Sequence, residues 1–398
     1  MTIHFKIKAF KMKSFENNDL FNFISMQVKI LKLFGLWFYI PHKVISLNFM
    51  VNVFIRIVLG FLIFVLPTVG QGLHILVLVI SRQTEIQDIA SEINMLLMEI
   101  MISVQLLDLQ CRRQHFSKLL EYLNVYEFSY TCCQEENIIK KGIRSSRKLF
   151  FGLITLATFD FLLHTVLITG WNGFQNLPVE MNYIVIDVRK EPVFTYVFVY
   201  QIVYKYLLIP IYASIQTMRW SFLLCAIAQL EMLIMKLKKF KDYNIEDYQD
   251  KFKKIVLHHC SIIRFVKEIE NVFGGQLILF FILNACVMCT TLLQFVSNKS
   301  VFDVLWVFGF LSILSLMLLI DCYYGTIITE KSDNIFSVIY SNPWITLPQF
   351  LKKYIIITNN QRSLVIRAGK LIPVSIQTFA KVMNWSYQGF ALFNQMRK

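Results

Sequence analysis

Charged side chains are scarce in this chain. Asp, Glu, Lys and Arg make up only 17% of its 398 residues, whereas a soluble domain usually carries about 25%. Hydrophobic residues reach 56%, and the mean hydropathy is +0.53. A soluble chain of this length would split into two or three domains, but here the apolar runs fall throughout. We therefore predict one polytopic membrane domain covering residues 1–398.

The chain also lacks the motifs of common enzymes and metal sites. It has no phosphate-binding glycine loop, no His-Glu-x-x-His sequence and no nucleophile elbow, so we predict no enzymatic activity and no cofactor. His258–Cys260 looks like a metal cluster, but adjacent side chains on a helix point apart. Neither Cys132–Cys133 nor the Cys286-x-x-Cys289 pair has the second pair that a zinc site requires. No metal is expected.

Two further absences narrow the class of protein. Residues 1–20 contain no short apolar core before a cleavage site, so we expect no signal peptide, and the first span must act as its own insertion signal. The net charge of +14 suggests an anionic partner. No basic run is interleaved with aromatic residues in a polar domain, however, so nucleic acid is not an expected partner. The basic residues stand between apolar runs, as in a membrane protein that contacts lipid.

Seven stretches are long and apolar enough to span a bilayer, which takes about 20 mostly apolar residues in a helix. They lie within residues 46–70, 88–110, 149–170, 193–217, 268–296, 302–327 and 371–393. The second is interrupted by Glu92, Glu99 and Asp108. The run Leu73–Ile80 is too short to span alone and is expected to extend or cap the first helix. The fourth helix is expected to continue below the bilayer through residues 218–240, turn, and return as the fifth.

The distribution of Lys and Arg predicts the orientation. Residues 1–45, 111–148, 218–267 and 328–370 contain 31 of these residues, and the connections on the opposite side contain 6. The amino terminus is therefore expected in the cytoplasm and, with seven spans, the carboxy terminus outside. This orientation is opposite to that of a G-protein-coupled receptor. No Asp/Glu-Arg-Tyr triplet follows the third span either.

The end of the chain carries a specific pattern. It includes Ser341-Asn342-Pro343-Trp344, then Ala368-Gly369-Lys370, and finally Trp385-Ser386-Tyr387-Gln388-Gly389-Phe390-Ala391-Leu392-Phe393. This order resembles the carboxy-terminal signature of insect odorant receptors. Cys322-Tyr323-Tyr324-Gly325 resembles the family pattern at the end of the sixth span, and Leu36-Trp37 resembles the entry to the first.

The resemblance implies a function. Members of that family are odorant-gated, non-selective cation channels, in which a variable tuning subunit joins a shared co-receptor in a heterotetramer. It implies a cytoplasmic amino terminus at 1–45, six spans and their loops in 46–327, a cytoplasmic anchor segment at 328–370, and a pore helix at 371–393. The co-receptor has a longer loop between spans four and five, so this chain resembles a tuning subunit. The implied location is the plasma membrane, in the dendrites of olfactory sensory neurons.

Three residues of the last span are candidates for the pore. Tyr387, Phe390 and Asn394 stand at i, i+3 and i+7, so they share one helical face. Phe390 is suited to a hydrophobic constriction, and Asn394 to a polar ring at the outer mouth. Ordinary interhelical packing remains an alternative for this face. The chain departs from the family pattern at Gln388–Gly389, where many members carry a hydroxylated and an aromatic residue.

An odorant pocket should be mostly apolar, with one or two polar groups that orient the ligand. In the predicted orientation, the outer halves of the second, third, fourth and sixth spans offer such a set. The candidates are Met95, Met98, Asp160, Phe161, His164, Thr165, Phe194, Tyr196, Val197, Tyr200, Gln201, Trp306 and Phe310. Each is also compatible with lipid exposure or core packing. Asp160 and His164 are four residues apart and can pair on one helix.

Two other functions stay open. A gustatory receptor of the same superfamily would share the topology, although that family ends in a Thr-Tyr pair and Gln-Phe, which this sequence fits less well. A secondary transporter would predict inverted repeats and broken midplane helices, and no repeat is detected. Asn298-Lys299-Ser300 is a glycosylation sequon in a predicted outer loop.

Overall fold

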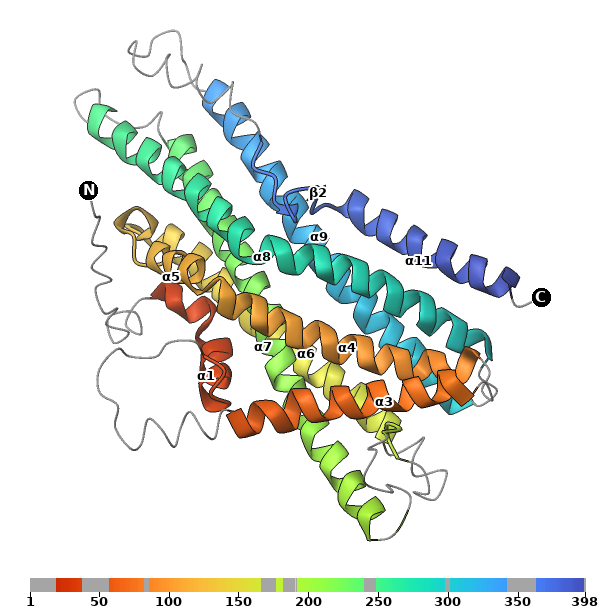
Figure 1. Cartoon of the computed structure of the whole chain (residues 1–398). Helices are drawn as coiled ribbons and strands as arrows, with labels where there is room; N and C mark the ends of the chain where they lie inside the picture. Colours follow the sequence, from red (N-terminus) through yellow and green to blue (C-terminus); the bar gives the residue numbers. More distant parts are fainter. Residues whose placement is uncertain are drawn as a thin grey trace, which may run out of the picture.

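The computed structural model of the chain is built mainly from long helices. It describes residues 19–37, 57–81, 86–165, 177–181, 190, 192–239, 248–297, 301–341 and 363–396. The long helices run side by side as an elongated bundle (Figure 1). The α-helices are α1 (Ser25–Leu33), α3 (Leu66–Ser81), α4 (Ile86–Cys111), α5 (Arg113–Tyr122), α6 (Cys133–Leu162), α7 (Val193–Lys238), α8 (Tyr248–Ser297), α9 (Val301–Tyr340) and α11 (Ile376–Met396). The shorter elements are η2 (Asp19–Phe23), η3 (Phe61–Val65), η4 (Tyr126–Phe128), β1 (Arg367–Ala368) and β2 (Ile372–Pro373).

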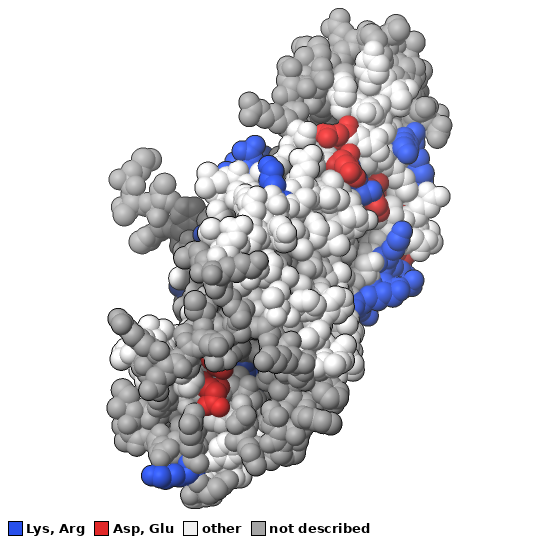
Figure 2. Space-filling view, turned by 90° about the vertical axis from the view of Figure 1, so that its right-hand side faces the viewer, with Lys and Arg blue, Asp and Glu red and all other residues white. Residues whose placement is uncertain are grey.

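Five of the described helices are long and apolar enough to cross a bilayer. They cover Ile57–Ile80, Cys133–Thr165, Val193–Lys238, Gln249–Val296 and Val304–Tyr340. The protein is therefore an all-α membrane protein, as the sequence predicts. On the face seen in Figure 2, most of the described charged side chains lie in the upper half, and a largely uncharged band of described surface separates them from the charged groups near the lower end. Such a band suits the hydrocarbon layer, where charge is costly.

The predicted spans correspond to helices, with shifted ends. The described first span runs from Ile57 to Ile80, so the run Leu73–Ile80 does extend that helix, while residues 46–56 lie outside the described part. The second span is α4, which carries Glu92, Glu99 and Asp108 and is not among the five helices above. It packs along α8, and Glu99 is almost completely buried. Because packing against other helices buries Glu99, α4 does not need an apolar residue at that position.

Helices α7 and α8 extend well beyond the length that a bilayer requires. The fourth predicted span, 193–217, continues to Lys238, and α8 starts at Tyr248, ahead of the predicted fifth span at 268–296. This confirms that the fourth helix continues and returns as the fifth; the turn at 240–247 lies outside the described residues. Helix α9 likewise runs on to Tyr340, so the first third of the predicted anchor segment 328–370 is helical. Residues 342–362 of this segment lie outside the described part of the chain.

The last helix begins later than predicted. The sequence suggested a helix over 371–393, but α11 starts at Ile376, and Pro373 lies in β2 instead of a first helical turn. The reason is a tight antiparallel hairpin, in which Arg367 pairs with Pro373 and Ala368 with Ile372. Its turn is made by Gly369 and Lys370, both with positive φ, at 57° and 63°.

Contacts with distant helices hold this hairpin in place. The Gly369 N–H donates to the carbonyl oxygen of Gly274 on α8 at 2.7 Å. On α9, the Thr326 hydroxyl accepts from the Ile376 N–H at 3.0 Å. Ser375 then caps α11, accepting at Oγ from the Thr378 N–H at 3.4 Å. The hairpin therefore fixes the start of α11 against both α8 and α9.

Candidate ligand cavity

A cavity of about 150 Å³ lies within the bundle, between α4, α6, α7 and α9. Most of its lining is aliphatic, aromatic or thioether side chains, with a small number of polar groups. The lining residues are Met95, Met98, Glu99, Ile102, Leu153, Ala157, Asp160, Phe161, His164, Lys205, Leu208, Ile209, Tyr212, Trp306, Phe310, Ile313, Leu314 and Met317. A concave, mostly apolar site with few polar groups is the usual form of a small-molecule site.

Seven of the thirteen predicted pocket residues line this cavity. They are Met95 and Met98 from α4, Asp160, Phe161 and His164 from α6 and its last turn, and Trp306 and Phe310 from α9. Helices far apart in the sequence thus bring these side chains together around one space.

The other six predicted residues do not line the cavity. Tyr196 is 72% exposed, and Phe194 stacks on Phe198 of its own helix, with ring centroids 6.2 Å apart. The Thr165 hydroxyl donates to the carbonyl oxygen of Phe161 at 2.9 Å. Val197, Tyr200 and Gln201 also lie outside the lining. The cavity lies further along α7 than predicted, at Lys205, Leu208, Ile209 and Tyr212.

A short segment packs near the cavity on the side of α7 that carries Gln201. The Gln201 amide makes two hydrogen bonds to Val179: its Oε1 accepts from the backbone N–H at 3.1 Å, and its Nε2 donates to the carbonyl at 2.7 Å. Val179 and Met181 pack with Tyr204 in one hydrophobic cluster, against which Met95 also packs. Gln201 therefore fixes this covering segment and does not face the ligand space.

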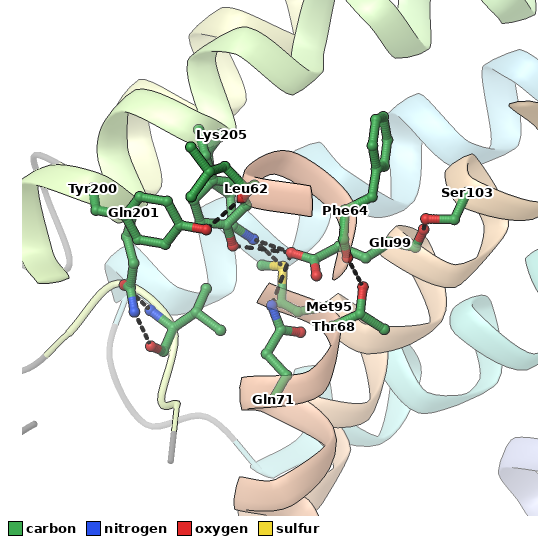
Figure 3. Close-up of polar contacts among 12 residues, drawn as sticks. Leu62, Phe64, Thr68, Gln71, Met95, Glu99, Ser103, Tyr200, Gln201 and Lys205 are labelled. Carbon is green, nitrogen blue, oxygen red and sulfur yellow. Dashed lines mark hydrogen bonds and ion pairs between the residues drawn. The ribbon is translucent and has the colours of Figure 1, made fainter. Parts of the chain in front are cut away.

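The polar end of the cavity is a network around Glu99, shown in Figure 3. Its Oε1 accepts hydrogen bonds from Gln71 Nε2 at 2.8 Å and from the Tyr204 hydroxyl at 2.9 Å. Lys205 Nζ lies 3.8 Å from the same oxygen and 3.6 Å from Met95 Sδ. The two charged side chains are 11% and 4% exposed. The predicted pocket set contains neither residue, although Glu99 interrupts the second predicted span. An ionisable side chain inside a predicted span is the signal that would have found both.

The opposite end of the cavity is aromatic. The Trp306 ring lies 4.6 Å from that of His164 and stacks on Phe310 at 5.9 Å. No ion pair forms between Asp160 and His164, although both are described, so the predicted helical pair is wrong. Asp160 Oδ1 and His164 Nδ1 are instead buried without a hydrogen-bond partner.

The predicted pore residues lie on the part of α11 that other described helices leave uncovered. Tyr387 is 62% exposed, Phe390 and Asn394 are partly exposed, and the rings of Tyr387 and Phe390 are 6.3 Å apart. The face that packs on the bundle carries Val382 and Ser386, both buried.

Gly389, where the sequence departs from the family pattern, packs against α8. A Cβ at this position would lie 3.1 Å from Cys289 Sγ. The glycine therefore permits a close approach of α11 to α8 and does not interrupt the exposed face.

Other candidates from the sequence have simpler explanations. His258 is buried, and its Nε2 bonds to Gln229 Oε1 at 2.8 Å. Among the described residues no group of three or more potential metal ligands occurs. All eight cysteines are free. The Asn298 sequon lies outside the described residues.

Three kinds of comparison place this arrangement among known proteins. The sequence profile of the 7tm odorant receptor family matches residues 85–387. Odorant receptor 10 of Aedes albopictus is 23% identical over 57% of this chain and 62% of its own length. Putative odorant receptor 92a of Drosophila melanogaster is 28% identical over 38% of this chain and 37% of its own. These matches thus span less than two thirds of either relative.

The fold is also similar to solved structures. The insect olfactory receptor OR5 of Machilis hrabei superposes with a TM-score of 0.79, covering 95% of this chain and 98% of that one at 19% identity. The same receptor in complex with eugenol superposes with a TM-score of 0.81 at 17% identity. At such identity the likeness establishes the shared fold.

Proposed function

This chain belongs to the 7tm odorant receptor family, and we propose that it is the ligand-binding tuning subunit of an odorant-gated cation channel. The observation that carries the proposal is the cavity between α4, α6, α7 and α9. It lies between packed helices, is mostly apolar, and is polar at one end. Such a space suits a small, largely apolar molecule that partitions out of water.

The size of the cavity favours a compact ligand. An engineered apolar cavity of about 150 Å³ holds benzene, and this cavity has a similar volume of about 150 Å³. A single aromatic ring with a short substituent is therefore the preferred ligand class. The related fold of OR5 has been solved in complex with eugenol, which supports the choice of single-ring probes. The aromatic end at Trp306 and Phe310 suits stacking on such a ring.

The proposed pore is formed by α11 helices of several subunits. Tyr387 is exposed, and Phe390 and Asn394 are partly exposed, so these side chains are available for contact with symmetry-related helices. Phe390 is suited to a constriction that excludes water. We propose that the channel is a heterotetramer with a co-receptor in the plasma membrane. In this assembly the amino terminus is cytoplasmic, as the Lys and Arg distribution predicts.

One helix connects the proposed binding cavity to the base of α11. Helix α9 lines the cavity through Trp306–Met317. Further along, Thr329 Oγ1 donates to the carbonyl of Leu364 at 3.1 Å, and Thr326 Oγ1 accepts from the Ile376 N–H at 3.0 Å. A ligand that shifts α9 would therefore act directly on the hairpin and on the first turn of α11. Because α9 is one continuous helix, no other element has to move to transmit this shift from the cavity to α11.

Ala157 offers a direct test. Ala157→Phe places a ring in the cavity and should abolish currents evoked by single-ring odorants in cells that express the chain with a co-receptor. The matched control is Leu156→Phe, because Leu156 is 43% exposed on the same helix and lies outside the cavity lining. It should respond like the wild type. Undiminished currents from Ala157→Phe at normal surface levels would reject this cavity as the odorant site.

The same experiment separates the alternatives. Odorant-evoked unitary currents that require a co-receptor support an odorant receptor subunit, whereas ligand-dependent flux without unitary currents would indicate a transporter. Because the matching profile is that of odorant receptors, we prefer this function to that of a gustatory receptor.

A further inference from the structure

The hydrogen bonding around Glu99 leaves one cation incompletely satisfied. Glu99 Oε1 already accepts two hydrogen bonds of normal length, from Gln71 Nε2 at 2.8 Å and from the Tyr204 hydroxyl at 2.9 Å. These two donors occupy the approach to that oxygen. Lys205 Nζ consequently stays 3.8 Å away, beyond the 2.7–3.2 Å of an N–H···O hydrogen bond.

The remaining contacts of the Lys205 ammonium are weak. An ammonium has three donors and no acceptor. Its contacts here are Met95 Sδ at 3.6 Å, a weak acceptor, and the ring of Tyr204, whose centroid is 5.7 Å away. The side chain is only 11% exposed, so bulk water does not readily complete its hydrogen bonding. A buried charge with unused donors gains strongly from an added acceptor.

Lys205 lies where a ligand can supply that acceptor. Both Lys205 and Glu99 line the cavity. Gln71, which donates a hydrogen bond to Glu99, is not part of the lining. The lining also contains His164 and the apolar side chains of Met95, Leu208 and Ile209. A ligand oxygen at this end would therefore meet an ammonium in a low-dielectric environment, where its hydrogen bond is stronger than in water.

We infer that Lys205 determines ligand specificity by donating a hydrogen bond to the carbonyl oxygen of an uncharged odorant. This inference rests on the proposed function, since it names the ligand class of the same cavity. An anionic ligand is disfavoured because Glu99 and Asp160 also line the cavity, and a carboxylate would face both. An aldehyde or ketone supplies the acceptor without adding charge. The aromatic end at Trp306 then holds the ring of the ligand.

Pairs of ligands with the same shape isolate the carbonyl. Benzaldehyde and styrene differ by replacement of C=O with C=CH₂, as do acetophenone and α-methylstyrene. With the wild-type chain and a co-receptor, we expect the EC50 of each carbonyl compound to be about 10- to 100-fold lower than that of its hydrocarbon partner. Benzoate should be weaker than benzaldehyde.

Lys205→Met should remove the preference, because Met keeps the length of the side chain and loses the donors. The EC50 of each carbonyl compound should come to within about threefold of that of its hydrocarbon partner. The readout is the ratio of the two EC50 values within a pair, because any effect of the substitution on folding or gating applies to both members of the pair. Lys238→Met, which removes an exposed lysine from the same helix, is the matched control and should keep the wild-type ratio.

The outcomes separate this inference from the function on which it rests. Equal potency within each pair in the wild type, a preference that persists in Lys205→Met, or stronger activation by benzoate would overturn the role of Lys205 and leave the odorant receptor intact. Silence of the wild type to every ring compound, despite surface delivery with a co-receptor, would overturn both. If Lys205→Met does not reach the surface, the same ligand pairs are titrated against purified wild-type receptor, and binding is measured by tryptophan fluorescence. Equal dissociation constants within each pair would then overturn the role of Lys205.

Discussion

Arg219 on α7 and Asp321 on α9 form an ion pair whose two side chains are both 0% exposed. Arg219 Nε donates to Asp321 Oδ1 at 2.8 Å, and Trp220 Nε1 donates to the same oxygen at 2.9 Å. The guanidinium also lies 5.3 Å from the ring centroid of Phe280 on α8. Three helices therefore meet at one buried charge pair.

Asp321→Asn should destabilise the receptor strongly, because it leaves the Arg219 guanidinium buried without a counter-charge. Removing one partner of a buried pair typically costs about 3–5 kcal/mol. We expect a clear fall in the melting temperature of the detergent-solubilised protein, measured by fluorescence-detected size exclusion. The double variant Arg219→Met with Asp321→Asn should recover much of the loss, since no unpaired charge remains.

A second ion pair provides the control for that comparison. Lys331 Nζ and Glu231 Oε1 are 2.8 Å apart, but their side chains are 27% and 37% exposed. A solvent-exposed pair contributes about 0–1 kcal/mol, so Lys331→Met should leave the melting temperature nearly unchanged. Equal effects of Asp321→Asn and Lys331→Met would contradict the importance assigned to burial.

Gly325 on α9 should not tolerate a side chain. A Cβ at this position would lie 2.2 Å from the carbonyl oxygen of Val374, so Gly325→Ala must separate α9 from the segment that precedes α11. Overpacking of this kind costs about 1–3 kcal/mol. We expect a lower melting temperature and, because the proposed coupling runs through this contact, a smaller odorant-evoked current per receptor at the surface.

Gly152 on α6 is the matched glycine. A Cβ there meets nothing within 4 Å, and alanine is favoured over glycine in a helix by about 1 kcal/mol. Gly152→Ala should therefore be neutral or stabilising and should leave the current intact. Comparable losses of stability in the two variants would show that the contact with Val374 is not what constrains Gly325.

Hydropathy and charge predict where the helices of this protein lie, but they predict few of the contacts between these helices. Runs of apolar residues locate all of the long helices, and the periodicity after residue 217 predicts that α7 continues. The later start of α11 depends on a hydrogen bond between Gly369 and Gly274 on α8. That contact joins residues 95 positions apart and has no local signal in the sequence.

The same limit applies to the cavity. On α6 and α9, residues chosen for the outer half do line it, including His164 and Trp306. On α7 the predicted set lies too near the start of the helix. Between residues 208 and 237 almost every α7 position is buried, so no apolar stripe indicates which face meets the cavity. Lys205 lines the cavity because of the way α7 packs among its neighbours, which the sequence of α7 does not indicate.

Phe390→Ala tests the proposed constriction in the pore. If the ring excludes water from the closed channel, a methyl group in its place should let the pore hydrate and raise the current that flows without odorant. Whole-cell recording with a co-receptor, with and without a pore blocker, measures this basal current. Leu392→Ala is the control, because Leu392 is 58% exposed and points about 200° around α11 from Phe390, by the 3.6-residue periodicity of a helix. It should leave the basal current unchanged. A basal current that rises equally in both variants would indicate a general loosening of α11, and no rise in Phe390→Ala would place the constriction at another residue.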